Sequence, residues 1–453
     1  MAYAAMTKDE AQRSIRTFYV AVRFHMQIVL FRLMNHVGGK LPATDEEHEK
    51  IRWYRAANRS SQRRKAMDFG LSEELVMLRE MVRGFAAGKI APYADEWDAK
   101  HYFPYEEVVK PMGELGLFGT IIPEEYGGNE MGWLAAMIIT EEIARASSSL
   151  RVQINMQEIG CAYTIYRHGS EELKRKYIAK LVSAETLGAF AITEPEAGSD
   201  VMAIKSTAED KGDHWLLNGT KTWISNATVG GINIYYAYTD RSAGGRGLSA
   251  FVVELDNFNG ITVTDQDKMG SRSSPTGEII LEDTRVPKEN ILGKPGDGTK
   301  IVFSSLAQTR LSAAAGGVGL SQACLDVATK YAMERQQFGQ PIGHFQMNQD
   351  MIAQMAAEIE AVRLLVYRAA WQKDQGNLSN NLEVAQAKYM AGELAYKCSQ
   401  YAMRILGAYG YSTEYPVARY FRDAPTYALV EGSANICKFI IAQDQLGIRK
   451  ANR

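Results

Sequence analysis

The 453-residue sequence predicts an α+β fold in which a helical domain, a mostly antiparallel β-domain and a second helical domain follow one another. Three observations lead to this prediction. Apolar residues recur at helical spacing from residue 72 to about 190, runs of β-branched and aromatic residues alternate with turns from 191 to 300, and helical spacing returns after 300. The expected domains are residues 67–190, 191–300 and 301–453, preceded by an extension of residues 1–66.

The first 66 residues differ from the rest of the chain in charge. They contain 13 Lys and Arg against 6 Asp and Glu, whereas the whole chain has a net charge of −2. One hypothesis is that Met67 is the native start and that residues 62–66 are the translation of a purine-rich ribosome-binding site. The alternative is a basic targeting or docking arm. In the first case the extension is not part of the native fold.

Each domain has its own sequence pattern. After a start at Ser72, Leu75, Leu78, Val82 and Phe85 lie on one helical face. Residues 232–238, 248–254 and 278–281 are expected to be strands, because they are apolar or aromatic runs between Gly-rich turns. Residues 352–366 and 382–406 are expected to be long packed helices, the second of which ends near Gly407.

Composition limits the class of protein. A sequence pI near 6.4 argues against nucleic acid as a main partner. The four cysteines are far apart with no CxxC pair, which favours buried thiols in a reducing cytoplasm and argues against a metal site; they are Cys161, Cys324, Cys398 and Cys437. The longest apolar stretch, residues 17–34, is interrupted by Arg23, His25 and Arg32, so no membrane span is expected.

Two motifs at the start of the β-domain favour a flavin site. In residues 191–200, Thr193, Ser199 and the backbone around Gly198 offer small hydrogen-bond donors to a polar ring and a pyrophosphate. Residues 218–226 combine an expected Asn-Gly hairpin turn with an aromatic side chain and a hydroxyl group. Either motif alone could be an ordinary turn and strand, but their combination indicates a flavin.

The glycines at 316, 317 and 319 do not form a dinucleotide-binding motif. No strand precedes them, and they lie in Ala-rich helical sequence. We therefore expect close helix packing there and reject a Rossmann fold.

Glu431 is the candidate base. Apolar Leu429 and Val430 precede it, and Gly432 follows with a local break suited to presenting a side chain into a cleft. The alternative is a surface glutamate at a helix cap. A carboxylate base and a flavin together would remove a proton and a hydride from an acyl thioester. Such a base works best when burial raises its pKa.

From Met67 to its end the chain resembles the acyl-CoA dehydrogenase family, on the motifs above and on residues 335–339 and 405–411. The resemblance implies an N-terminal helical domain, a middle β-domain and a C-terminal four-helix bundle, assembled as a homotetramer with FAD. It also implies an acyl-CoA substrate and electron-transfer flavoprotein as the electron acceptor. Glu431 matches the family base, whose backbone N–H helps to hold the thioester oxygen.

The resemblance also implies the cofactor-binding residues. Around the flavin ring these are Phe190, Ile192, Thr193, Ser199, Trp223, Ile224 and Ser225. Residues expected to reach the FAD of a neighbouring subunit are Arg335, Phe338 and Gln346. Those expected to close over its adenosine part are Leu406, Gly407 and Gly410, and those following the base are Ser433 and Asn435.

Ser199 is expected to contact the substrate as well, and Arg310 resembles the arginine that meets the CoA nucleotide. An acidic residue often found three positions before that arginine is Ala307 here. The alternative for Arg310 is an interdomain salt bridge.

Arg151 bears on the acyl group. It follows three serines and a leucine, as in the glutaryl-CoA dehydrogenase branch of the family, where the matching arginine binds the distal carboxylate. The alternative is a solvated helix arginine. Decarboxylating members of the branch carry a tyrosine and a glutamate where this chain has Val430 and Ala144, and a serine where it has Val152. This departure resembles the non-decarboxylating enzymes of anaerobic bacteria, which stop at glutaconyl-CoA.

Other functions stay open at this stage. The substrate could be another dicarboxylyl-CoA, a cyclic acyl-CoA or a short-chain acyl-CoA, and the electron acceptor could be O₂. From a different class, the chain could be a non-catalytic flavin-binding protein that acts in complex assembly.

Overall fold

The computed structural model describes residues 70–256 and 258–448, and the residues from Leu78 onward belong to one compact unit. The expected extension 1–66, Met67 and the apolar stretch 17–34 lie outside the described residues. Within them, no helix is both long enough and apolar enough to cross a membrane. The four cysteines are buried free thiols, as their spacing predicted.

The N-terminal part is helical, as predicted. Its main elements are α3 (Glu73–Lys89), α4 (Ala94–Lys100), α5 (Lys110–Glu114), α6 (Trp133–Ala146), α7 (Ser148–Ile154), the π-helix η3 (Asn155–Ala162), α8 (Tyr163–His168) and α9 (Glu171–Val182). Ser147 ends α6 and caps α7, where its side chain accepts a hydrogen bond from the backbone N–H of Leu150 at 3.4 Å. The two helices therefore meet at a fixed corner just before Arg151.

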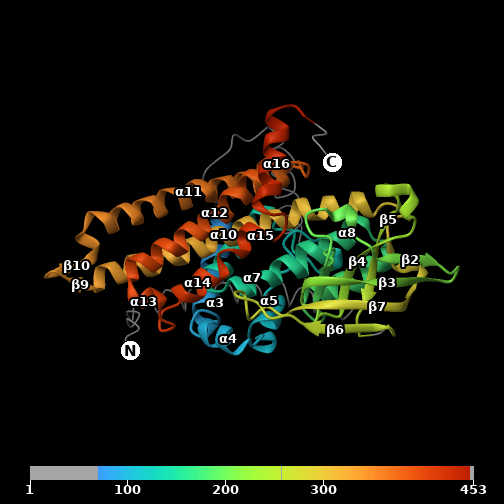
Figure 1. Cartoon of the computed structure of the whole chain (residues 1–453), viewed down its shortest axis with the longest axis horizontal. Helices are drawn as coiled ribbons and strands as arrows, with labels where there is room; N and C mark the ends of the chain where they lie inside the picture. The colour runs from blue at the N-terminus through green and yellow to red at the C-terminus, as the bar shows by residue number, and fades with distance from the viewer. Residues whose placement is uncertain (1–69, 257, 449–453) are drawn as a thin grey trace, which may run out of the picture. The chain divides into compact units, whose positions relative to one another are not determined.

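The middle part is an eight-stranded sheet in the order β6-β7-β3-β2-β4-β5-β8, with β1 paired to β4 (Figure 1). The strands are β1 (Gly188–Ala191), β2 (Thr207–Asp210), β3 (His214–Ser225), β4 (Ile232–Tyr238), β5 (Leu248–Glu254), β6 (Ile261–Asp265), β7 (Thr276–Pro287) and β8 (Ile291–Leu292). Among the described strands β1 and β2 pair with β4 in parallel and the other pairings of this sheet are antiparallel. The predicted mostly antiparallel β-domain is confirmed.

The expected Asn-Gly hairpin turn is wrong. Asn218 and Gly219 lie inside β3, where the pairing with β7 shifts register at a β-bulge. Gly219 has a φ of 146°, and a Cβ there would lie 2.2 Å from the hydroxyl oxygen of Ser206. The close approach of Ser206, just before β2, explains the glycine, and local turn propensity does not record such a contact.

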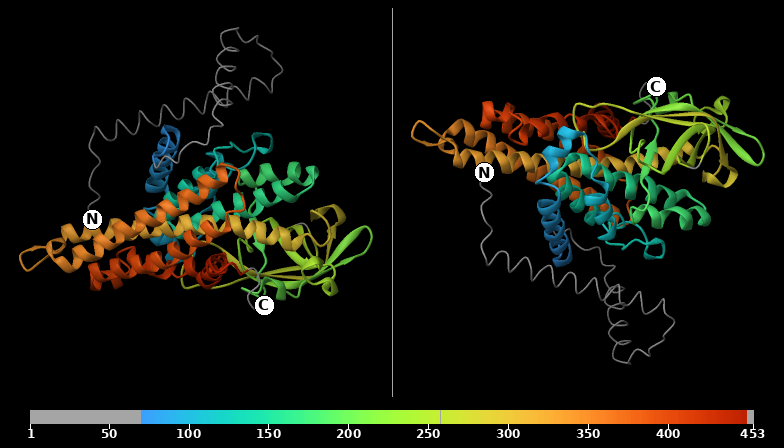
Figure 2. Two further views of the ribbon diagram at one scale, coloured as in Figure 1. Left: turned by 90° about the horizontal axis from the view of Figure 1, so that it is seen from above. Right: turned by 90° about the horizontal axis from the view of Figure 1, so that it is seen from below.

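The C-terminal part is a helical bundle. It contains α10 (Gly298–Glu334), α11 (Gln346–Asp374), α12 (Asn381–Leu406), α13 (Ala408–Tyr411), α14 (Val417–Asp423), α15 (Thr426–Leu429) and α16 (Ala434–Gln445). Helix α10 packs on α6, α11 and α12, and the short strands β9 (Gln336–Gln337) and β10 (Gln340–Pro341) join it to α11 (Figures 1 and 2). A Cβ at Gly317 would lie 2.9 Å from the Ala391 carbonyl oxygen of α12, and one at Gly319 would lie 2.2 Å from that of Glu141 in α6. The predicted close packing at these glycines is confirmed.

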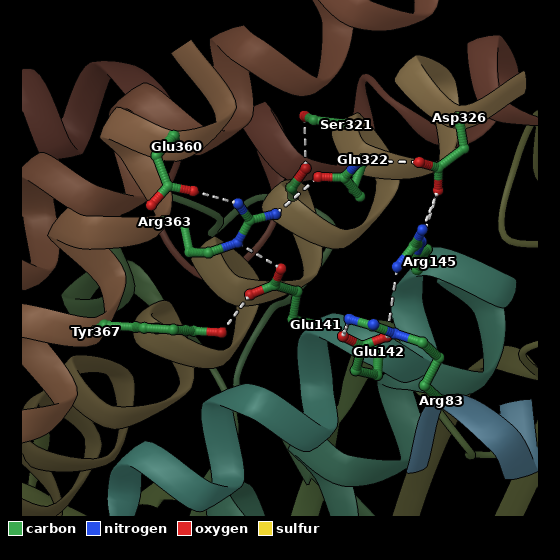
Figure 3. Close-up of polar contacts among 11 residues, drawn as sticks. Arg83, Glu141, Glu142, Arg145, Ser321, Gln322, Asp326, Glu360, Arg363 and Tyr367 are labelled. Atoms are coloured by element: carbon green, nitrogen blue, oxygen red, sulfur yellow. Dashed lines mark hydrogen bonds and ion pairs between the residues drawn. The ribbon is translucent and has the colours of Figure 1, made fainter. Parts of the chain in front are cut away.

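Two adjacent buried glutamates fix α6 against other helices (Figure 3). Glu141 accepts hydrogen bonds from Arg363 Nε at 2.8 Å and from the Tyr367 hydroxyl at 2.9 Å, both on α11. Glu142 accepts two from the guanidinium of Arg83 on α3, at 2.6 and 3.0 Å. Buried carboxylates are costly unless they are paired. The network therefore sets the position of α6 and, through it, of α7.

Candidate active site

A cavity of about 650 Å³ is lined by residues of α7, α10, α15, the π-helix η3 and the β-domain. Most of the site residues expected from the sequence line it, although they come from distant segments. They are Arg151, Phe190, Ile192, Thr193, Ser199, Trp223, Ile224, Ser225, Arg310, Val430, Glu431 and Ser433.

The Glu431 carboxylate is held at the cavity by two side chains from other elements. Its Oε1 accepts a hydrogen bond from Asn155 Nδ2 at 2.9 Å, and its Oε2 accepts one from Thr309 Oγ1 at 2.5 Å. Asn155 begins η3 and Thr309 lies in α10, so neither is close to Glu431 in sequence. The carboxylate is thus fixed in orientation at the cavity wall, as a general base requires.

The backbone at Glu431 has an uncommon conformation. Its φ is 57°, and that of Gly432 is 88°, so two consecutive residues occupy the left-handed region. Arg310 Nε donates to the Glu431 carbonyl oxygen at 3.1 Å, and a Cβ at Gly432 would lie 2.8 Å from the same Nε. Ser433 caps α16, where its hydroxyl accepts from the Ile436 N–H at 3.4 Å. The alternative of Glu431 as a helix cap is therefore wrong.

Arg151 is a buried arginine that faces the cavity, with 3% of its surface exposed. Its guanidinium carbon lies 5.1 Å from the centre of the Tyr427 ring. Within the described ranges 70–256 and 258–448 its Nε has no hydrogen-bond partner, and it forms no ion pair. The alternative of a solvated helix arginine is therefore wrong. A buried unpaired cation at a cavity favours an anionic ligand.

Arg310 is also buried at the cavity, and burial lowers the pKa of its guanidinium. Its contact with Glu431 is to the backbone carbonyl oxygen, and in the described part of the chain it forms no salt bridge. The alternative of an interdomain salt bridge is not what the structure contains. Arg310 therefore ties α10 to the segment that carries the candidate base.

The expected flavin residues form a polar wall beside an exposed ring. Thr193 and Ser225 line the cavity together with Trp223, whose surface is 58% exposed. In the same wall the buried hydroxyls of Ser271 and Ser274 find no hydrogen-bond partner among the described residues. Orphaned buried hydroxyls beside an exposed aromatic face suit a flat polar ligand, so these residues fit a flavin.

A buried ion pair that sequence reasoning missed supports this wall. Lys221 Nζ donates to Glu194 Oε1 at 2.8 Å and to the Ile192 carbonyl oxygen at 3.0 Å. Burial lowers the pKa of Lys221 to about 8. Because Lys221 is in β3 and Ile192 follows β1, the pair joins the two flavin motifs. The sequence signal that could have indicated this ion pair is that Glu194 lies in one flavin motif and Lys221 in the other.

Other expected site residues lie away from this cavity and do not line it. Figures 1 and 2 show that the β9–β10 hairpin, which lies between Arg335 and Gln346, is at the end of α10 and α11 remote from the sheet. Phe338 is 93% exposed there, and Arg335 lies over the Tyr409 ring at 5.8 Å. The remaining ones are Leu406, Gly407, Gly410, Asn435 and Ala144.

Ala144 has a packing role, since a Cβ at Gly319 would lie 2.8 Å from its own Cβ. Ala144 therefore lies against α10. It does not line this cavity, although the sequence led us to expect it near the substrate. Asn435 is exposed on α16, shortly after the cap residue Ser433. Leu406 is buried in α12, and Gly407 ends that helix with a φ of 61°.

This fold, with a glutamate and a buried arginine facing one cavity, defines a class of enzyme. Family models of the acyl-CoA dehydrogenase N-terminal, middle and C-terminal domains match residues 72–185, 189–284 and 296–446. The chain therefore belongs to the acyl-CoA dehydrogenase family, whose members are FAD-dependent flavoproteins, and the α+β fold class expected from the sequence is confirmed.

Individual relatives show which members of the family the chain resembles. The chain is 71% identical to the glutaryl-CoA dehydrogenase of Desulfococcus multivorans over 389 residues, which are 85% of this chain and 100% of that protein. A solved structure of a glutaryl-coenzyme A dehydrogenase–glutaryl-CoA complex matches with a TM-score of 0.84 at 70% identity, over 85% of this chain and 98% of that one. The short-chain specific acyl-CoA dehydrogenase of mouse mitochondria is 41% identical over 82% of this chain and 90% of that protein.

Proposed function

We propose that the chain dehydrogenates glutaryl-CoA to glutaconyl-CoA without decarboxylation, with FAD bound in the cavity and electron-transfer flavoprotein as the acceptor. The observation that supports this substrate is Arg151, a buried guanidinium on the cavity wall that forms no ion pair with any of the described residues. The higher identity to a glutaryl-CoA dehydrogenase than to a short-chain enzyme supports the same substrate.

Glu431 is the base in this proposal. It takes the α-proton of the acyl chain, while FAD, when bound, supplies the acceptor for the hydride that leaves the β-carbon. Asn155 and Thr309 each donate to one carboxylate oxygen and so hold the carboxylate in one orientation at the cavity wall. Thr193, Trp223 and Ser225 would hold the flavin ring.

Arg151 selects the acyl group by charge. A distal carboxylate would supply the counter-charge that the guanidinium lacks among the described residues, and would form a charge-assisted hydrogen bond with it. A short unbranched acyl chain offers no such partner and would leave the cation buried without a counter-charge. A glutaryl group is therefore favoured over a butyryl group, and the longer or cyclic acyl groups remain the alternatives.

The absence of decarboxylation is inferred from the side chains near the acyl site. Val430 and Val152 line the cavity with apolar surface, and Ala144, which packs against α10 and does not line the cavity, carries no carboxylate either. The hydroxyl of Tyr427, whose ring contacts Arg151, donates to Ser148 Oγ at 3.0 Å. Nothing in this set relays a proton to the γ-carbon, so the product should keep its distal carboxylate.

The test is an anaerobic titration of the flavin-loaded protein with glutaryl-CoA, in which flavin absorbance is followed and the product is identified by mass spectrometry. Bleaching with glutaconyl-CoA as the product is expected. Stoichiometric CO₂ and crotonyl-CoA would overturn the non-decarboxylating proposal. Bleaching by another acyl-CoA in a substrate panel, but not by glutaryl-CoA, would overturn the substrate.

The rival functions give different results in the same apparatus. A non-catalytic assembly protein would show no bleaching with any acyl-CoA. An oxidase would be reoxidised rapidly when the reduced protein is mixed with O₂, whereas the proposed dehydrogenase needs electron-transfer flavoprotein.

The homotetramer is proposed from family membership, with Arg335, Phe338 and Gln346 reaching a neighbouring subunit. Light scattering tests it. The buried free thiols favour a cytoplasmic location.

A further inference from the structure

A buried lysine lies directly beneath the segment that carries Glu431. Lys388, on α12, is 1% exposed. Its Nζ donates to the Tyr427 carbonyl oxygen at 2.5 Å and lies 3.4 Å from that of Gly432. These two carbonyl groups flank Glu431 on both sides, so one ammonium group spans residues 427–432, which we call the base segment.

The same face of α12 brings its backbone close to the base segment. Gly392 lies one helical turn after Lys388, and a Cβ at Gly392 would lie 2.7 Å from the Tyr427 carbonyl oxygen and 3.0 Å from the Ala428 Cα. No larger residue fits there unless the base segment moves. The glycine permits the approach, and the lysine uses it to bind the carbonyl groups.

Burying this lysine is costly, which argues for a role. Burial lowers the pKa of Lys388 to about 8, which leaves it mostly charged at neutral pH. Cys437 and Glu431 raise the pKa of Lys388, whereas the cations Arg151 and Arg310 lower it, as burial does. It has hydrogen bonds to backbone oxygens and, among the described residues, no ion pair. A methionine would fill the same space at lower cost.

We propose that Lys388, together with Gly392, is a positioning residue that holds the base segment in the left-handed conformation that directs Glu431 into the cavity. The inference rests on the proposed function, in which Glu431 is the base. Arg310 binds the Glu431 carbonyl oxygen from α10, so helices α12 and α10 hold three carbonyl groups of one strained turn.

The experiment compares Lys388→Met with Lys373→Met in flavin-loaded protein. Lys373 is a matched control, because it is also buried, its pKa is also lowered to about 8 by burial, and it lies over the Trp133 ring, without contact to the base segment. For Lys388→Met we expect kcat per flavin to fall at least about ten-fold, with KM for glutaryl-CoA little changed. The isotope effect with α-deuterated substrate should increase, since proton removal becomes slower.

Lys373→Met should keep kcat and the isotope effect of the wild type, whatever its melting temperature. If Lys388→Met has wild-type kcat and isotope effect, or changes them no more than Lys373→Met does, the inference is wrong. If Lys388→Met does not fold, Gly392→Ala takes its place, with the same expected loss of kcat and the same contradicting result. Glu431→Gln distinguishes a failure of the proposed function from a failure of this inference. If Glu431→Gln keeps turnover, the base assignment is wrong. If it loses turnover while Lys388→Met does not, only the role of Lys388 is wrong.

Discussion

The guanidinium of Arg151 lies against the face of Tyr427, 5.1 Å from the ring centre, in a space that Gly316 leaves open. A Cβ at Gly316 would lie 2.8 Å from Tyr427 Cε1 and 3.0 Å from Arg151 Cδ. The arginine is therefore held between α10 and α15, with its charge at the cavity. This confinement, the candidate base and a buried carboxyl group in η3 can each be tested by substitution.

Arg151→Gln should raise KM for glutaryl-CoA far more than KM for butyryl-CoA, because only the first substrate loses a charge partner. The ratio of the two kcat/KM values should change by about ten- to a hundred-fold, as for a charged hydrogen bond of about 1.5–3 kcal/mol. Steady-state kinetics with both substrates measures it. Arg145→Gln is the control, since Arg145 pairs with Asp326 at 2.6 Å outside the cavity. Equal effects on both substrates would remove Arg151 from the acyl site.

Gly316→Ala should weaken glutaryl-CoA binding without any change in charge. The added methyl group must displace Arg151 or Tyr427, and overpacking of this kind costs about 1–3 kcal/mol of stability. Thermal unfolding and KM for glutaryl-CoA measure the two effects. Gly84→Ala is the control, because a Cβ there meets nothing within 4 Å. Wild-type KM and melting temperature in Gly316→Ala would show that the arginine is not confined as described.

Glu431→Gln should lose about 10²–10⁴-fold in turnover while it keeps its flavin, because an amide cannot accept the α-proton. Flavin absorbance and anaerobic bleaching by glutaryl-CoA are the measurements. Glu414 is exposed and does not line the cavity, so Glu414→Gln is a control that should have normal turnover. Near wild-type bleaching by Glu431→Gln would refute its role as the base.

Glu158 predicts a pH dependence of stability. It is buried in η3, and burial raises its pKa from 4.5 to about 7, although Thr120 Oγ1 and the Ile121 N–H both donate to its Oε1 at 2.8 Å. Its folded-state pKa lies above the unfolded value, so the folded protein binds more protons than the unfolded chain between these values. The stability of the wild type relative to Glu158→Gln should therefore fall by up to about 3 kcal/mol as pH rises from about 4.5 to about 7.

Chemical denaturation of wild type and Glu158→Gln at about pH 5 and about pH 8 measures this difference. The exposed Glu172 supplies the control variant Glu172→Gln, which makes the same substitution outside the core. A pH-independent difference for Glu158→Gln would mean that Glu158 is ionised at both pH values or at neither.

The sequence predicts the elements whose patterns are local. The runs 232–238 and 248–254 are β4 and β5, because continuous β-branched and aromatic residues suit strands buried on both faces. The prediction of a turn at Asn218 was wrong because the next residue, Gly219, is required by its contact with Ser206. Ser206 lies just before a different strand, so the sequence around Asn218 does not reveal this contact. Local propensity cannot contain a contact made by the folded chain.

The same limit applies to the site. Glu431 and Arg151 stand out in the sequence, and both face the cavity. Asn155, Thr309 and Lys388 do not stand out, because each is an ordinary polar residue in helical sequence until folding brings it to the base segment. Their contacts with that segment join residues 39 to 276 positions apart, and no local pattern records them.

The most direct test of the proposed chemistry is a crystal structure of the flavin-loaded protein with glutaryl-CoA. We expect the Glu431 carboxylate within about 3.5 Å of C2 of the acyl chain, and the Arg151 guanidinium within about 3 Å of the distal carboxylate. A complex in which either side chain points away from the acyl chain would contradict the proposal.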